Sequence, residues 1–79
     1  MEEKFKEVVA RYCQVNAEDI TDDMSFRDDL GLSSLDLMTF LGDLEDEFDV
    51  TIPAVEIIPA NFNSAKALWA MITRLQEEE

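Results

Sequence analysis

Apolar residues recur at helical spacing in three stretches of the chain, and each stretch predicts an amphipathic helix. The first covers about residues 2–13, the second residues 34–48, and the last begins near Ser64, a good N-cap residue. The expected buried stripes are Phe5, Val8, Val9 and Tyr12 in the first, Leu35, Met38, Leu41, Leu44 and Phe48 in the second, and Leu68, Trp69, Ile72 and Leu75 in the last.

Two further segments break this periodicity. Residues 16–33 are polar and acidic with single apolar residues between them, which indicates a long loop pinned to the core. The pinning residues would be Ile20, Met24, Phe26, Leu30 and Leu32. Residues 54–58 lie between Pro53 and Pro59, which favours a short helix that ends at the second proline. The pattern therefore predicts a single all-α domain over residues 1–79.

The negative charge of the chain limits which classes of molecule can bind it. The 79 residues carry a net charge of -13, and residues 18–56 hold thirteen acidic residues against Arg27 alone. A nucleic-acid backbone is excluded as a ligand because neutralising phosphates requires cations that the chain lacks. We expect basic protein partners, attracted in a salt-dependent way. One cysteine, no leader-like apolar run and no long apolar stretch favour a cytoplasmic monomer without a membrane span.

The chemistry available to the chain is limited. Histidine is absent, which removes the commonest general base and leaves no credible zinc site beside the single Cys13. Cys13 borders the first buried stripe, so we interpret it as a small packed residue without a functional role. An EF-hand reading of residues 19–30 fails because Met24 takes its glycine position and Leu30 its closing glutamate position. We therefore expect no metal site.

The remaining chemical feature is a pair of serines at the start of the second helix. Ser33 is an N-cap candidate, with Asp36 three residues later, and Ser34 would be the first helical residue with its hydroxyl toward solvent. The amides and dipole of a helix start favour an anion, so a phosphodiester on Ser34 would suit this position. From the residues alone, a plain helix cap is the other interpretation.

These serines lie in a motif that resembles acyl carrier proteins. Residues 28–36, DDLGLSSLD, are similar to the family signature D-L-G-x-D-S-L-D, and residues 44–50, LEDEFDV, followed by Ile52 and Pro53, resemble its later L-E-x-x-F and I-P segments. The resemblance implies a four-helix bundle with a short third helix and a long loop between helices one and two. It also implies that Ser34, three residues after Gly31, carries phosphopantetheine donated by coenzyme A. Ser33 stands where the family usually has Asp, so two hydroxyls adjoin.

The resemblance further implies a protein that is not an enzyme but carries an acyl, aminoacyl or polyketide group as a thioester between biosynthetic enzymes. Its partners would be a phosphopantetheinyl transferase and basic-surfaced transferases, ligases or synthases. Fatty-acid, polyketide, nonribosomal-peptide and D-alanyl pathways all remain open, and Gly42 inside the second helix would suit either close packing or an open space.

We expect the partner surface to lie beside Ser34. Its apolar members would be Leu35, Leu37, Met38, Val55 and Ile57, and its charged rim Asp36, Glu45, Asp46 and Glu56. Leu37 and one residue of the pair Val55 and Ile57 are the ones we expect to be exposed, because so small a core has no room for them all. The alternative function is an acidic helical adaptor with no prosthetic group; a hydrolase using Ser34 lacks a visible base.

Overall fold

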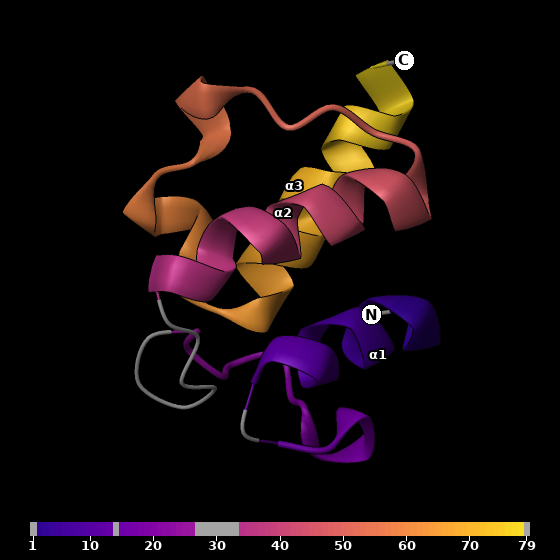
Figure 1. Cartoon of the computed structure of the whole chain (residues 1–79), viewed down its shortest axis with the longest axis vertical. Helices are drawn as coiled ribbons and strands as arrows, with labels where there is room; N and C mark the ends of the chain where they lie inside the picture. The colour runs from indigo at the N-terminus through magenta and orange to yellow at the C-terminus, as the bar shows by residue number, and fades with distance from the viewer. Residues whose placement is uncertain (1, 14, 27–33, 79) are drawn as a thin grey trace.

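The computed structural model describes residues 2–13, 15–26 and 34–78. Within these ranges the chain forms three α-helices and three 3-10 turns, and no strand. The elements in chain order are α1 (Glu3–Tyr12), η1 (Ala17–Asp19), α2 (Ser34–Phe48), η2 (Ala54–Glu56), η3 (Pro59–Phe62) and α3 (Ala65–Glu78). The three long helices confirm the stretches that the hydrophobic pattern predicts, and the all-α class is confirmed for the described residues (Figure 1).

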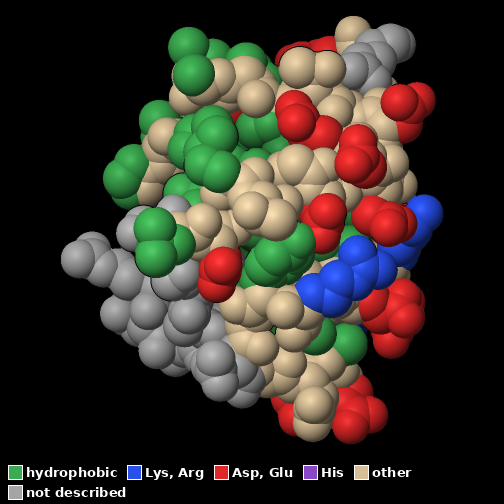
Figure 2. Space-filling view, in the orientation of Figure 1, with side chains coloured by type: hydrophobic (Ala, Val, Ile, Leu, Met, Phe, Trp, Pro, Cys, Tyr) green, Lys and Arg blue, Asp and Glu red, His purple; other side chains and the backbone are tan. Residues whose placement is uncertain are grey.

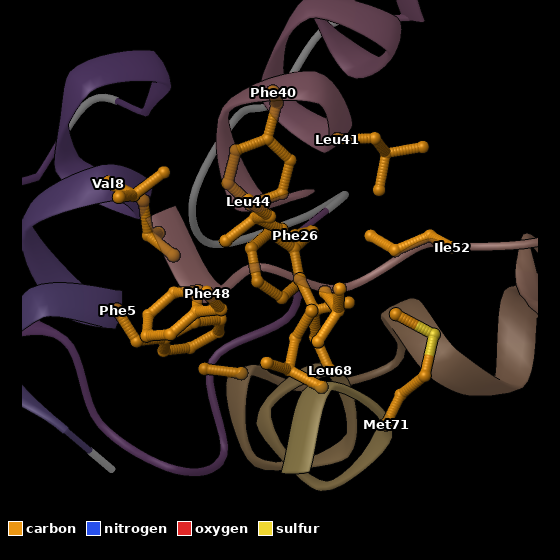
Figure 3. Packing of buried hydrophobic residues seen from close by; sticks show 14 of the residues in the cluster. Phe5, Val8, Phe26, Phe40, Leu41, Leu44, Phe48, Ile52, Leu68 and Met71 are labelled. Carbon is orange, nitrogen blue, oxygen red and sulfur yellow. The ribbon is translucent and has the colours of Figure 1, made fainter. Parts of the chain in front are cut away.

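The three α-helices share one hydrophobic core (Figure 3). Its buried members are Phe5, Val8, Val9, Ile20, Phe26, Phe40, Leu41, Leu44, Phe48, Val50, Ile52, Ala65, Leu68, Met71, Ile72 and Leu75. Three rings join the helices at one end of the core: the Phe5 ring centroid lies 5.1 Å from that of Trp69, and Phe48 lies 5.4 Å from Trp69. Tilted or edge-on contacts at such distances add to the stabilisation that burial alone provides. Trp69 itself is half-buried, although we expected it to be buried.

The connection between α1 and α2 is anchored to the start of α3. Ile20 and Phe26 are buried, and Met24 packs against the core, as the loop pattern predicts. The carbonyl oxygen of Met24 accepts a hydrogen bond from the Ala65 amide at 2.8 Å, and that of Asp22 accepts one from the Lys66 amide at 3.1 Å. The loop therefore satisfies backbone donors that the first turn of α3 would otherwise leave unpaired. The expected contributions of Leu30 and Leu32 lie outside the described residues.

The short third helix predicted over residues 54–58 is present only as a 3-10 turn, η2, which covers Ala54–Glu56. A second 3-10 turn, η3, follows it. We expected Pro59 to end the short helix, but Pro59 is instead the first residue of η3. Ile58, between the turns, is extended, with φ -128° and ψ 154°. A residue before proline is pushed out of the helical region, so the segment between the prolines is too short for an α-helix. The predicted count of four helices is therefore not confirmed: the described residues form three α-helices and this segment, which we call the strap (residues 53–63).

The buried stripe of α2 also differs from the one predicted. The core-facing residues are Phe40, Leu41, Leu44 and Phe48, while Leu35 and Met38 are exposed. An α-helix turns by about 100° per residue, so three steps of three residues from Leu35 to Leu44 rotate the side chain by about 180°. Residues chosen at three-residue spacing alone therefore do not lie on one side of the helix, which is why the predicted stripe contains both exposed and buried residues.

Candidate functional site

Ser34 is the first residue of α2, which is the position that the sequence predicts for it. This helix is fifteen residues long, so its first turn has backbone N–H groups and a dipole end that favour a negatively charged group such as phosphate. The environment of the Ser34 hydroxyl lies outside what the structure describes, as do the predicted Gly31 turn and Ser33 cap. The geometry that the structure does provide is the backbone position of Ser34 and the helix surface that follows it.

That surface is apolar and exposed. Leu35 is 90% exposed and Met38 is 68% exposed, both within the first turn and a half of α2. Val55 in η2 is 78% exposed, and Ile58 between the strap turns is also exposed. We call Leu35, Met38, Val55 and Ile58 the apolar patch. Figure 2 shows hydrophobic side chains gathered on the left of the molecule, over the start of α2 and the strap.

Two predicted members of the partner surface belong partly to the core. Leu37 is half-buried and packs against the core, which corrects the expectation that it is exposed. Leu37 precedes Leu44 by seven residues, which is nearly two whole turns, so both residues face the same side of the helix. Ile57 is also half-buried against the core, whereas Val55 is exposed, which confirms that one residue of this pair is exposed.

Glu45 has a structural task in this fold. Its Oε2 atom accepts a hydrogen bond from the Ile52 amide at 2.7 Å, and its carbonyl oxygen accepts one from the Val50 amide at 3.2 Å. Asp49, the first residue after α2, adopts a left-handed backbone conformation with φ 52°. Helices commonly end at a residue in this conformation. The side chain that we expected to meet a partner thus holds the exit from α2.

Glu56 also has a partner within the chain. The Arg74 guanidinium donates from Nη1 to Glu56 Oε2 at 2.7 Å and from Nη2 to Oε1 at 2.8 Å. The Asn61 amide nitrogen donates to the Glu56 carbonyl oxygen at 2.6 Å and to Oε1 at 3.2 Å. The hydrogen bonds from Arg74 hold the pKa of Glu56 below its usual value. This group ties the strap to α3, and no sequence pattern links residues eighteen positions apart.

Besides Glu45, α2 carries four acidic residues, and two of them form ion pairs with α1. Asp43 and Glu47 face α1, where Lys4 lies 3.3 Å from Glu47 and Arg11 lies 3.7 Å from Glu47 and 3.9 Å from Asp43. The Tyr12 hydroxyl donates to Asp43, and this hydrogen bond raises the pKa of Tyr12. Asp36 and Asp46, two predicted rim residues, are exposed, and the negative charge of Asp36 also contributes to the raised pKa of Tyr12 in α1.

Cys13 packs against the core and is half-buried, as predicted. Burial raises the pKa of its thiol to about 11, because the thiolate is disfavoured away from water. The thiolate, which is the nucleophilic form, is therefore scarce at neutral pH.

The described residues contain no group of three or more Cys, Asp or Glu side chains placed to hold a metal ion. In that part of the chain, no helix has both the length and the apolar character that crossing a membrane requires.

Comparison with known families adds a match over nearly the whole chain. The family model described as a phosphopantetheine attachment site covers residues 3–78, from the start of α1 to the end of α3, and so includes Ser34. This confirms the resemblance that the sequence motif indicates. The chain belongs to the family of phosphopantetheine attachment-site domains, and phosphopantetheine is its covalent cofactor.

Proposed function

We propose that the chain is an acyl carrier protein whose attachment residue is Ser34. The observation that supports this most strongly is that Ser34 begins α2 inside the matched region and is followed at once by the exposed side chains of Leu35 and Met38. A carrier needs a hydroxyl that an enzyme can approach, beside a surface on which that enzyme can dock. The exposed side chains of Leu35 and Met38 offer such a surface directly after Ser34 in α2.

The chemistry of the residues fits the cofactor. A phosphodiester needs an alcohol, which Ser34 has, and the first turn of α2 favours the phosphate charge. By contrast, Ser64 at the start of α3 accepts a hydrogen bond from the Ala67 amide at 3.0 Å, and loop carbonyls take the two preceding amides. The helix start at α3 is thus used by the chain itself, which favours Ser34 over Ser64.

The cofactor and the protein would have different roles. When attached, phosphopantetheine supplies a thiol on a flexible arm, on which acyl, aminoacyl or polyketide groups are carried as thioesters. The protein holds the phosphate end at α2 and presents the surface that enzymes recognise. The chain has no histidine, and its one cysteine thiol is held protonated, so we propose that the chemical steps belong to its partners and not to the chain.

The proposed partners are basic-surfaced enzymes, first a phosphopantetheinyl transferase and then acyl or aminoacyl transferases, ligases or synthases. Leu35, Met38 and Val55 would supply apolar contact, with Asp36 and Asp46 on the charged rim. The net charge of -13 favours a cationic partner and would speed encounter at low salt. Glu45 and Glu56 would contribute to the negative field while remaining bonded within the chain.

Intact-mass measurement after incubation with coenzyme A and a phosphopantetheinyl transferase tests the proposal. A carrier gains the mass of one phosphopantetheine group; Ser34→Ala abolishes the gain, and the matched Ser33→Ala variant retains it. Loss of the gain in Ser33→Ala alone would move the attachment to residue 33. A wild-type chain that binds a partner but never gains mass would instead be an adaptor.

A further inference from the structure

The sulfur atoms of this protein lie in very different surroundings. Met71 is only 1% exposed and lies among the buried residues of α3 (Figure 3), and Met24 is half-buried against the core. Met38 is 68% exposed on the same chain. An oxidant must reach the thioether from solvent, so these exposures predict very different rates of oxidation.

The Cys13 thiol should react only slowly with the same oxidant. Cys13 is half-buried, and at neutral pH only roughly one thiol in a thousand or fewer is ionised when the pKa lies near 11. The negative field of the protein would repel anionic oxidants, but hydrogen peroxide is uncharged and is not excluded by it. Neutral peroxides are therefore the oxidants that the surface of α2 admits.

Oxidation of Met38 would change the polarity of the surface beside Ser34. Met38 follows Ser34 by four residues, a rise of about 6 Å along α2, and belongs to the apolar patch with Leu35. A sulfoxide replaces an apolar thioether by a strongly polar group. Any enzyme that covers Met38 must then bury that group, which costs free energy unless the enzyme supplies a hydrogen-bond donor.

We propose that Met38 is the most oxidation-sensitive of the methionines that the structure describes, that neutral peroxides convert it to the sulfoxide, and that this weakens docking beside Ser34; the docking part rests on the proposed carrier function. In this step the Met38 sulfur attacks one peroxide oxygen and the O–O bond breaks. The sulfur is oxidised by two electrons and keeps one oxygen, while the other oxygen leaves as water from hydrogen peroxide, or as an alcohol from an organic peroxide. A methionine sulfoxide reductase would reverse the change.

The first test treats the whole 79-residue chain with hydrogen peroxide, then with a thiol reductant so that cysteine products are reversed, and follows each peptide by mass spectrometry. We expect Met38 to be oxidised at least about tenfold faster than Met24 and Met71. The oxidised chain should also be retained less strongly on a hydrophobic column, with an unchanged circular dichroism spectrum. Equal rates at Met24 or Met71, or unchanged retention, would overturn the proposal whether or not the protein is a carrier.

The second test measures the initial rate of phosphopantetheine transfer before and after peroxide treatment. We expect a loss of roughly three- to tenfold, restored by methionine sulfoxide reductase. Met38→Leu, compared with its own untreated rate, should lose nothing, and Met24→Leu should lose as much as wild type. An oxidised chain with an undiminished rate would overturn the docking part. An untreated wild-type chain that never accepts the group would overturn the carrier function, and the docking part with it.

Discussion

The two long sides of α2 are built differently. On the side toward the core and α1, Phe40, Leu41 and Leu44 are buried, and the carboxylates of Asp43 and Glu47 meet Arg11 and Lys4. On the other side, Leu35 and Met38 are exposed, and among the described residues no heavy atom of a neighbouring group lies within 4 Å of where a Cβ on Gly42 would be. The first side stabilises the fold, whereas the second adds little to stability. Under the proposed carrier function, the exposed apolar residues of the second side would contact partner enzymes.

Substitution of matched leucines on the two sides should give the largest difference. Leu44→Ala leaves a cavity in the core and should lower the free energy of unfolding by about 2–5 kcal/mol. Leu35→Ala removes a side chain that is 90% exposed and should change it by no more than about 0.5 kcal/mol. Urea unfolding followed by circular dichroism measures both, and similar losses would mean that the two sides of α2 are not distinct.

The same leucine should matter for docking although it does not matter for folding. Leu35→Ala should lower kcat/KM for phosphopantetheine transfer by about fivefold or more, the equivalent of about 1 kcal/mol of transition-state binding. Glu7→Ala, on an exposed position of α1, is the control and should leave this value unchanged. If both variants react like wild type, the apolar patch is not where the transferase docks.

A substitution at Gly42 tests whether the second side of α2 has free space next to the helix. A methyl group there would meet no neighbouring atom, so Gly42→Ala should gain most of the helix-propensity difference, about 1 kcal/mol. For a domain of this size that corresponds to a rise in melting temperature of roughly 4–8 °C. Ala70→Gly, at an exposed position of α3, is the matched reverse change and should lower stability by a similar amount. A destabilising Gly42→Ala would show that the second side is closed.

The strap beside the apolar patch should show the smallest effect, and one that depends on pH. The pKa of Glu56 is lowered in the folded protein, so its bonds to Arg74 stabilise the fold above the ordinary glutamate range and are lost as pH falls through the lowered value. Wild type should therefore melt slightly above Glu56→Gln at pH 7, and the gap should close below about pH 4.

Hydrogen exchange locates the same effect in the strap. The amides of Ile57 and Asn61, which bond to Ala54 and Ile58 carbonyls, should exchange faster in both Glu56→Gln and Arg74→Gln at pH 7. The double variant should add little, since either change alone breaks the pair. Unchanged exchange in all three variants would show that Glu56 and Arg74 do not hold the strap.

The sequence predicted those features that depend on local patterns. The bounds of α2, the anchoring of Ile20 and Phe26, and the Ser64 cap all follow from spacing and residue type. The pairing of Glu56 with Arg74 could not be predicted in this way because it depends on how the strap meets α3. The burial of Leu37 could have been predicted, since its seven-residue distance from Leu44 was available in the sequence.

The most direct test of the central claim is to locate the attached group. Fragment-ion mass spectrometry of the wild-type chain, after reaction with coenzyme A and a transferase, reports which residue carries the added mass. The account predicts that phosphopantetheine lies on Ser34, at the start of α2. Phosphopantetheine on Ser33, Ser25 or Ser64, or a chain that gains none, would contradict it.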